Sequence, residues 1–187
     1  MNGQAVVIGA SGGIHRALVD RLVDSGRFEQ IHALARRSIT IKGADAGFID
    51  LGDEESIEQS ARLIGPEVDC LIVASGLLHA PGIRPERSLR DLDATQLTQV
   101  FAVNAIGPAM VLKHFAPLMA RDRRTTIALL LASVRSISDN RLGGWYGYRA
   151  SKAALDMNVK CSAIELARTK PQSICVAFIR ELSTPSY

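Results

Sequence analysis

The sequence predicts an α/β protein with a doubly wound parallel sheet, in which residues 1–187 form one domain. Short apolar runs have the composition of strands that are buried on both faces. Segments with apolar residues at helical spacing separate these runs. Because such βαβ units force parallel strands with right-handed crossovers, we expect helices on both faces and the strand order 3-2-1-4-5-6.

The expected strands are short and rich in Val, Ile, Leu and Ala. They comprise residues 5–9, 31–35, 47–50, 69–75, 126–133 and 173–178. In doubly wound sheets, ligands bind beyond the carboxyl ends of the strands. The polar and glycine residues that follow these runs are therefore the first candidates for a functional site.

Four helices are expected between the strands. They comprise residues 14–25, a segment that begins at Asp53, residues 95–120 and residues 148–168. Gly26 is a suitable stop for the first helix, and acidic residues favour the start of the second. Gly107-Pro108 predicts a break or kink in the third helix.

Composition and charge exclude several classes of protein. The chain is 47% hydrophobic and 22% charged, with a net charge of +3 and scattered basic residues. It lacks the basic stripe of a nucleic-acid-binding protein and the long apolar run of a membrane span. Since the N-terminus also lacks the pattern of a signal peptide, we expect a cytoplasmic protein that binds neither nucleic acid nor membrane.

The cysteines and histidines predict neither disulfides nor a metal site. Cys70, Cys161 and Cys175 form no CxxC pair, and each has apolar neighbours in the sequence, so we expect reduced thiols in the core. The four histidines have no ligand spacing.

A glycine-rich segment, Gly9-Ala-Ser11-Gly12-Gly13-Ile14, joins the first expected strand to the first helix. Glycines at this position let the backbone approach a pyrophosphate, and the helix N-terminus supplies N–H groups and partial positive charge. A tight turn without a ligand is the alternative for this motif taken alone.

Further motifs follow in a fixed order from residue 5 to residue 178. They are Asp50-Leu51, Ala74-Ser75-Gly76, Asn104 in Val-Asn-Ala-Ile-Gly, Ser133, and Tyr148-Arg-Ala-Ser-Lys152. With the glycine segment, where Ile8 replaces the usual Thr of TGxxxGxG, this set resembles the short-chain dehydrogenase/reductase family. The segment around Gly143–Lys152 is most similar to the C-factor-like and carbonyl-reductase-like branch. The resemblance implies a Rossmann-type fold and a nicotinamide dinucleotide.

Tyr148 and Lys152 are the candidates for proton transfer. A free tyrosine has a pKa of about 10, and a nearby ammonium lowers that value. Residues four apart share one helix face, which explains the YxxxK spacing. Tyr148 is then the general acid in carbonyl reduction and the general base in alcohol oxidation. Tyr146 is a weaker candidate because Ala150 stands four residues after it.

The resemblance adds Ser133 and Asn104 to the catalytic set. Ser133 is expected to bond the substrate oxygen, or alternatively to cap the end of a strand. Asn104 is expected to hold a water that relays protons to Lys152. Alternatively, its amide ties backbone across the helix kink, and both roles are compatible.

NADP(H) is the expected cofactor, and NAD(H) the less favoured one. Ala35 stands where an acidic residue would favour NAD, and the following Arg36 matches a 2′-phosphate, with Arg37 as a second candidate. Asp50 would accept from the adenine amino group or would instead serve as a cap before the next helix. The full expected cofactor set comprises Gly9, Ser11, Gly12, Gly13, Ile14, Arg36, Arg37, Asp50, Leu51, Ala74, Ser75, Gly76, Asn104, Tyr148 and Lys152.

Two features depart from the family pattern. His15 replaces the third glycine of the loop and adds bulk beside the pyrophosphate site. Residues 178–187 follow the sixth strand where the family has a Pro-Gly loop and a seventh strand. With one possible choice of codons for Leu-His-Pro-Gly-Thr-Val-Asp-Thr, the family's sequence at this place, deletion of the first base yields Phe-Ile-Arg-Glu-Leu-Ser-Thr, the sequence of residues 178–184. We therefore expect a chain truncated by a frameshift, with a separately evolved tail as the alternative.

The functional hypothesis is an NADP-dependent oxidoreductase that interconverts a carbonyl and an alcohol. The alternatives are a C-factor-like signalling or dinucleotide-binding protein with little turnover, and a damaged relative. The family commonly pairs subunits through the two long helices, so a homodimer is expected. The substrate is a small molecule that the sequence does not identify.

Overall fold

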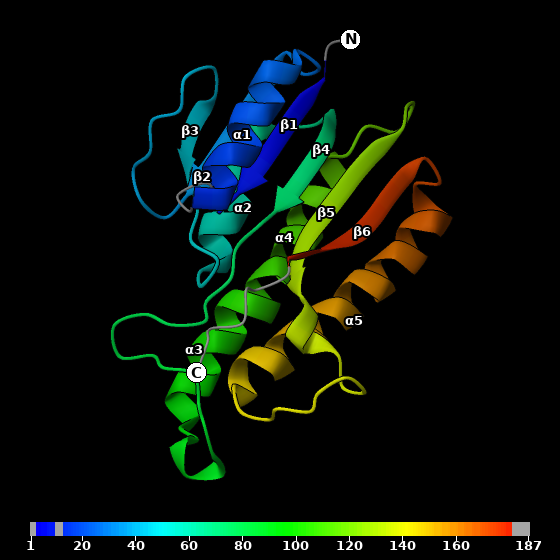
Figure 1. Ribbon diagram of the computed structural model, residues 1–187. Coiled ribbons are helices and arrows are strands. Elements are labelled where there is room, and N and C mark those ends of the chain that lie inside the picture. The colour runs from blue at the N-terminus through cyan, green and yellow to red at the C-terminus, as the bar shows by residue number, and fades with distance from the viewer. Residues whose placement is uncertain (1–2, 10–12, 181–187) are drawn as a thin grey trace.

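A six-stranded parallel sheet forms the centre of the protein (Figure 1). The computed structural model describes residues 3–9 and 13–180. The strands follow the order β3-β2-β1-β4-β5-β6, which confirms the predicted fold class and strand order. Their bounds are β1 Gln4–Ile8, β2 Gln30–Ala35, β3 Asp45–Phe48, β4 Val68–Val73, β5 Thr125–Ala132 and β6 Ser173–Arg180.

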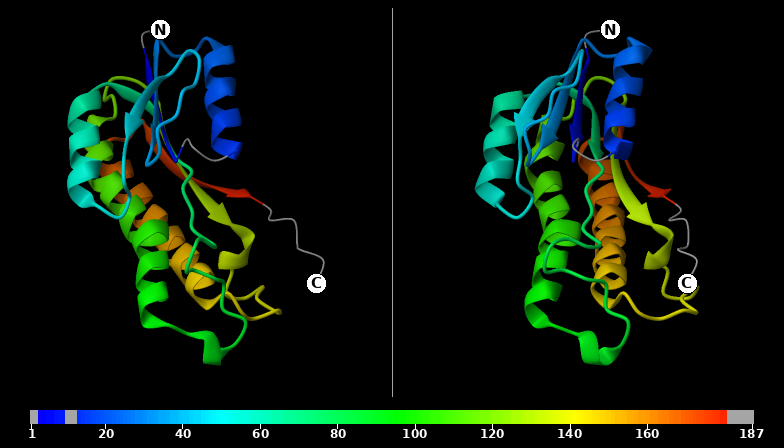
Figure 2. Two further views of the ribbon diagram at one scale, coloured as in Figure 1. Left: turned by 90° about the vertical axis from the view of Figure 1, so that its left-hand side faces the viewer. Right: turned by 60° about the vertical axis from the view of Figure 1, so that its left-hand side comes forward.

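Helices cover both faces of the sheet, as Figures 1 and 2 show. They are α1 Gly13–Ser25, α2 Glu54–Ile64, α3 Ala94–Phe101, α4 Gly107–Phe115 and α5 Tyr146–Thr169. Shorter turns are the 3-10 helices η1 Leu89–Asp91, η3 Ala116–Leu118 and η4 Ser133–Arg135 and the π-helical turn η2 Ala102–Ile106. Helix α1 lies on one face, and α2, α4 and α5 lie on the other.

The two hydrophobic cores follow from the alternation of side chains along β1. Val6 and Ile8 point into the larger core, which includes Phe115 of α4 and Leu155 of α5. Ala5 and Val7 belong to the smaller core beneath α1. All four β1 side chains are fully buried, so burial on both faces explains why this strand is a continuous apolar run.

The predicted break at Gly107-Pro108 is confirmed to within a few residues, but it takes the form of a π-helical turn and not of a proline kink. The irregular turn is η2, the π-helical turn immediately before this dipeptide, and α4 starts at Gly107 with Pro108 in its first turn. Proline lacks an N–H, which costs little at a helix start. A Cβ at residue 107 would collide with the Leu51 carbonyl, so the glycine allows close packing against the loop after β3.

Other boundaries shift by small amounts. Helix α5 begins at Tyr146, two residues before its predicted start, and β6 runs to Arg180. Within the described residues, β6 is an edge strand of the sheet. Residues 181–187 lie outside the described part, so the truncation and its frameshift origin stay predictions.

The expectation that every cysteine lies in the core is wrong for Cys161. Cys175 is buried and Cys70 half-buried, whereas Cys161 is exposed on α5. Apolar sequence neighbours did not reveal this because the exposure of a helical residue depends on which face meets the sheet. In the described part of the chain, no helix is long and apolar enough to span a membrane.

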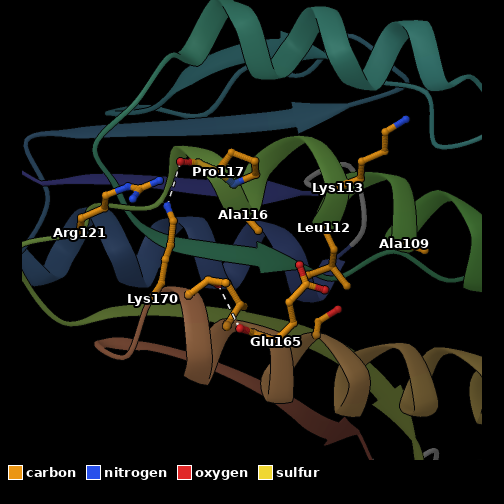
Figure 3. Close-up of a pocket in the computed structure, with 11 residues that line it drawn as sticks. Ala109, Leu112, Lys113, Ala116, Pro117, Arg121, Glu165 and Lys170 are labelled. Carbon is orange, nitrogen blue, oxygen red and sulfur yellow. Dashed lines mark hydrogen bonds between the residues drawn. The ribbon is translucent and has the colours of Figure 1, made fainter.

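A hollow of about 620 Å³ lies between α4 and α5 (Figure 3). None of the predicted site residues lines it. Lys170 closes one end, where its ammonium donates to the Pro117 and Met119 carbonyls at 2.8 and 2.6 Å. Burial lowers the pKa of Lys170.

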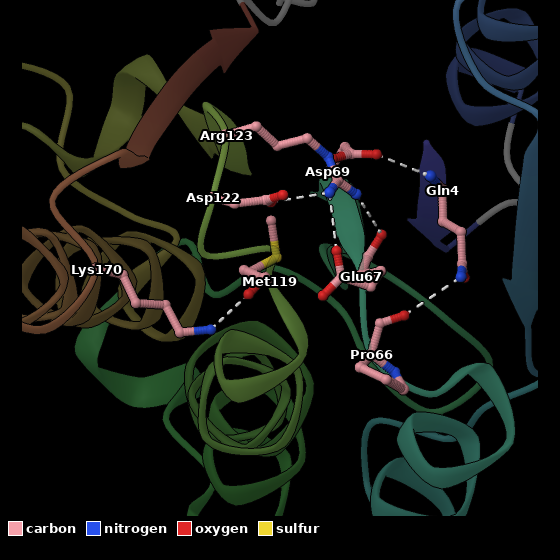
Figure 4. A network of polar contacts seen from close by, with 8 residues as sticks. All are labelled: Gln4, Pro66, Glu67, Asp69, Met119, Asp122, Arg123 and Lys170. Carbon is pink, nitrogen blue, oxygen red and sulfur yellow. Dashed lines mark hydrogen bonds and ion pairs between the residues drawn. The ribbon is translucent and has the colours of Figure 1, made fainter. Parts of the chain in front are cut away.

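A polar network joins the amino ends of β1 and β4 to the segment before β5 (Figure 4). Arg123 Nε donates to Asp69 Oδ1 at 2.5 Å, and its Nη1 contacts Glu67 and Asp122. The other oxygen of Asp69 accepts from the Gln4 N–H at 3.0 Å. Asp69 therefore ties neighbouring strands together on the side of the sheet opposite the candidate site.

Candidate functional site

A crevice of about 280 Å³ lies at the carboxyl edge of the sheet. The chain reverses its winding between β1 and β4, and loops that leave there in opposite directions open a gap. The residues that line it are Ile8, Gly9, Ala35, Arg36, Ile49, Asp50, Leu51, Ser75, Gly76, Leu77 and Val103.

Gly9 directly follows β1 and has a backbone conformation that favours glycine. Its φ is +94°, and an added Cβ would lie 3.2 Å from the backbone of Ala74 and Ser75. Gly9 N–H donates to Leu34, and Ala74 N–H donates to Ile8, so the strand ends stay paired. The backbone of this loop thus approaches β4 closely.

The rest of the predicted glycine segment is only partly described. Ser11 and Gly12 lie outside the described residues. Gly13 and Ile14 begin α1, but their side-chain surroundings, like those of His15, are not among the described features.

Arg36 and Arg37 follow β2 and are both exposed. Arg36 lines the crevice beside Ala35, whereas Arg37 does not. The two predicted arginines therefore differ in position, and only Arg36 borders the candidate ligand space.

Asp50 and Leu51 line the crevice beyond β3. Asp50 Oδ1 accepts from the Gly52 N–H at 2.9 Å and forms a local turn. Helix α2 is capped by Asp53, whose side chain accepts from Glu55 N–H. The alternative role of Asp50 as a cap of the helix is therefore wrong.

Ser75 and Gly76 form the crevice wall beyond β4. Among the described residues, the buried Ser75 Oγ has no hydrogen-bond partner. A Cβ on Gly76 would lie 3.3 Å from Lys152 Nζ. An unsatisfied hydroxyl beside a glycine-lined gap fits a polar ligand such as a dinucleotide, because buried polar groups are normally paired.

Lys152 is 1% exposed, although lysine is rarely buried. Its Nζ donates to the Leu130 carbonyl at 3.0 Å and the Ser75 carbonyl at 3.3 Å. Burial lowers its pKa to about 8. The side chain thus brings a fixed cation to the end of β4 and β5, close to the crevice.

Asn104 is fully buried in the π-helical turn η2. Its Oδ1 accepts from the Leu77 N–H at 2.6 Å, and its Nδ2 donates to the Leu77 carbonyl at 2.9 Å. Nδ2 also contacts Ser151 Oγ at 3.1 Å, and that hydroxyl donates to the Tyr148 carbonyl. Asn104 therefore ties η2 to the loop after β4, whereas the predicted alternative was a tie across the helix kink.

Tyr148 and Ser133 come from the two elements that follow β5. Tyr148 is 9% exposed in the first turn of α5, where its ring meets the Trp145 ring edge-on, with 6.4 Å between ring centroids. Ser133 is exposed at the start of η4, which packs against α5.

Sequence reasoning missed several residues that support the site. They are Leu77, Glu86, Trp145 and Ser151. Ser151 lies three residues after Tyr148, a helical spacing that offered a signal. Leu77 and Glu86 lie in an irregular loop, where no periodicity indicates a partner.

The family model described as short chain dehydrogenase matches residues 4–180. The chain belongs to this family. This match confirms the family resemblance seen in the motifs. Short-chain dehydrogenases are oxidoreductases. The predicted site residues that line the crevice at this sheet edge are Gly9, Arg36, Asp50, Leu51, Ser75 and Gly76.

Individual relatives share only about a quarter to a third of their aligned residues with this chain. The 1-hydroxy-2-glutathionyl-2-methyl-3-butene dehydrogenase of Rhodococcus sp. (strain AD45) is 26% identical over 160 residues, 81% of this chain and 66% of that protein. The C-signal of Myxococcus xanthus is 33% identical over 79 residues, 42% of this chain and 48% of that protein. The chain thus covers less than two thirds of each of these relatives, and the C-signal match is too short to confirm the C-factor-like branch.

Among solved structures, the NADPH-bound carbonyl reductase from chicken fatty liver aligns with a TM-score of 0.79 and 22% identity, covering 95% of this chain and 75% of that one. This likeness shows a shared fold.

Proposed function

We propose that this short-chain dehydrogenase is an NADP-dependent oxidoreductase that interconverts a small-molecule carbonyl and an alcohol. The observation that carries the proposal is the buried Lys152 ammonium, held between two strand-end carbonyls on the same helix as Tyr148. NADPH-bound and NADP-bound relatives of the same fold support the cofactor class.

In this proposal, each crevice residue binds a different part of the cofactor. Arg36 holds the 2′-phosphate, Asp50 and Leu51 border the adenine, and Gly9 gives the pyrophosphate a close backbone approach. Lys152 holds the nicotinamide ribose. When bound, NADP(H) supplies the hydride acceptor or donor.

Tyr148 is the proposed general acid for reduction and general base for oxidation. Lys152 lies one helical turn away and favours the phenolate. Ser133 donates a hydrogen bond to the substrate oxygen, and its exposure leaves the hydroxyl accessible. Asn104 supports the arrangement by holding Leu77 and Ser151 and, in the proposal, a relay water.

The alternative of a signalling or binding protein with little turnover has less support. It depends on His15 and on the C-terminal tail, whose surroundings the described residues do not include. The similarity to C-signal covers under half of the chain.

A homodimer through α4 and α5 is part of the proposal. The outer face of these helices carries the hollow of Figure 3, whose polar lining includes Lys113, Ser162 and Glu165. Light scattering at several protein concentrations tests this, and a monomer at all of them contradicts it. The free cysteines support a reducing, cytoplasmic location.

A titration tests the function directly. Trp145 is the single tryptophan, so quenching of its emission by NADPH, with NADH as the control, reports binding near α5. We expect saturable quenching that is tighter for NADPH. With 9,10-phenanthrenequinone as the probe carbonyl, Tyr148→Phe should lower kcat about 100-fold or more and leave the NADPH Kd within about 3-fold. Absence of NADPH binding, or full activity of Tyr148→Phe, overturns the proposal.

A further inference from the structure

Glu86 is a buried acid in the loop between β4 and η1, with 5% of its surface exposed. Its Oε2 accepts from the Gly147 N–H at 3.2 Å, 61 residues along the chain. Its backbone carbonyl accepts from the Trp145 N–H at 2.5 Å. A buried carboxylate is costly unless hydrogen-bonded, so this contact accounts for its position.

Helix α5 lacks local signals for its own start. Trp145 stands at the N-cap without a side-chain capping bond, and no acidic residue occupies the first turn. Helix N-termini have unsatisfied N–H groups and partial positive charge, which a carboxylate stabilises. Glu86 supplies this cap from a distant loop.

The backbone before α5 is strained and held in place. Gly143, Gly144 and Trp145 have successive positive φ angles of 66°, 63° and 51°. For tryptophan this conformation is unfavourable and persists only when surrounding contacts enforce it. Glu86 supplies one such contact, and Arg149 supplies another through Nε to the Gly144 carbonyl at 3.1 Å.

The side chains of Glu86 and Leu97 pack closely around Gly147. A Cβ on Gly147 would lie 2.9 Å from Glu86 Oε1 and 2.9 Å from Leu97 Cδ2 of α3. Tyr148 is the next residue along the helix. A displacement of the Glu86 carboxylate therefore acts on the turn that carries the phenol.

We propose that Glu86 is a positioning residue that fixes the first turn of α5. Its carboxylate accepts from the Gly147 N–H and its backbone carbonyl accepts from the Trp145 N–H, and we call these two contacts the latch. By fixing this turn, the latch positions the phenol of Tyr148. The effect on catalysis rests on the proposed function. Lys152 is a turn further along and has its own anchors on Ser75 and Leu130. Loss of the latch therefore impairs turnover more than cofactor binding.

The test compares Glu86→Ala and Glu86→Gln with Asp93→Ala. Asp93 caps α3 through the Gln96 N–H, so its variant removes a helix-capping carboxylate that bonds α3 itself and not the first turn of α5. Glu86→Ala removes the carboxylate but keeps the backbone carbonyl that accepts from the Trp145 N–H, so we expect amide hydrogen exchange to rise about 10-fold or more at residues 146–149. We expect kcat for 9,10-phenanthrenequinone to fall at least 10-fold, with KM and the NADPH Kd within about 3-fold. Glu86→Gln keeps an acceptor oxygen and should recover part of kcat. Asp93→Ala should change neither kcat nor that exchange.

Gly147→Ala perturbs the same contact from helix α5, because its added methyl group would lie 2.9 Å from Glu86 Oε1. Alanine favours helices, so a purely local view predicts slower exchange of the first turn. The latch predicts faster exchange and a loss of kcat like that of Glu86→Ala, because the methyl group displaces the carboxylate. Unchanged exchange in Glu86→Ala, or equal loss of kcat and NADPH affinity, overturns the proposal.

The exchange measurement separates the latch from the proposed function. If the wild-type chain binds no NADPH and has no turnover, the proposed function fails. Faster exchange confined to residues 146–149 in Glu86→Ala then still shows that the Glu86 carboxylate supports α5, and unchanged exchange there overturns the latch.

Discussion

The Nζ atom of Lys152 and the carbonyl oxygen of Leu130 lie 3.0 Å apart, inside the edge of the sheet. A second bond to the Ser75 carbonyl joins α5 to the ends of both β4 and β5. These carbonyls fix the direction of the lysine without an acidic partner among the described residues. The ammonium therefore keeps its charge available for a phenolate or a ribose at the cost of desolvation.

Lys152→Met should stabilise the protein at neutral pH. Burial lowers the folded-state pKa from 10.5 to about 8, so between these values the unfolded state binds more protons and stability rises with pH. The advantage of the variant is therefore greatest below pH 8 and should shrink by about 2 kcal/mol between pH 7 and 9.5. Urea unfolding at both pH values measures it. The exposed Lys160 on the same helix provides a control, since Lys160→Met should follow the wild-type pH curve.

Arg36→Glu should weaken NADPH binding selectively. Loss of a charge-assisted hydrogen bond, worth about 1.5–3 kcal/mol, predicts a 10- to 100-fold higher Kd for NADPH and a change within about 3-fold for NADH. Calorimetric titration measures both. Arg37→Glu makes the same change in charge outside the crevice. An equal effect of the two variants would show that general positive charge, not a specific contact, selects the cofactor.

Asn104→Ala should destabilise the fold. The change leaves the Leu77 N–H and carbonyl without their partner, which costs about 2–4 kcal/mol for two partly buried groups. Chemical denaturation measures the loss. Asn158 makes one long contact of 3.5 Å to the Ala105 carbonyl, so Asn158→Ala should cost less than about 1 kcal/mol. Similar losses in both variants would contradict the role assigned to the Leu77 clamp.

Asp69→Ala should weaken the sheet at its amino edge. The variant removes the acceptor for Gln4 N–H and the partner that raises the pKa of Arg123, for an expected loss of about 2–3 kcal/mol. Glu58→Ala breaks an exposed ion pair with Arg62 and should lower the free energy of unfolding by only about 0.3–0.5 kcal/mol. Urea denaturation measures the free energy of unfolding of both variants. Added salt at about 1 M should reduce the destabilisation caused by Glu58→Ala more than that caused by Asp69→Ala. A loss for Asp69→Ala no larger than that for Glu58→Ala would contradict this account.

The strands and their order were predictable because their signals are local. Apolar runs of four to eight residues, separated by helical patterns, allow few arrangements once crossovers must be right-handed. The crevice was predictable for the same reason, since parallel strands bring Gly9, Arg36, Asp50 and Ser75 to one edge. The π-helical turn was not predictable, because Gly107-Pro108 signals an irregularity without giving its register.

The sequence by itself determined the sheet, the family and the residue types at the strand ends. Only the tertiary structure decided how these residues are supported. Lys152 is held by a residue 77 positions away, Gly147 by one 61 away, and Asn104 by one 27 away. The geometry of such contacts depends on how helices and loops pack together, because neither periodicity nor local propensity relates a loop residue to a helix that begins 60 residues later.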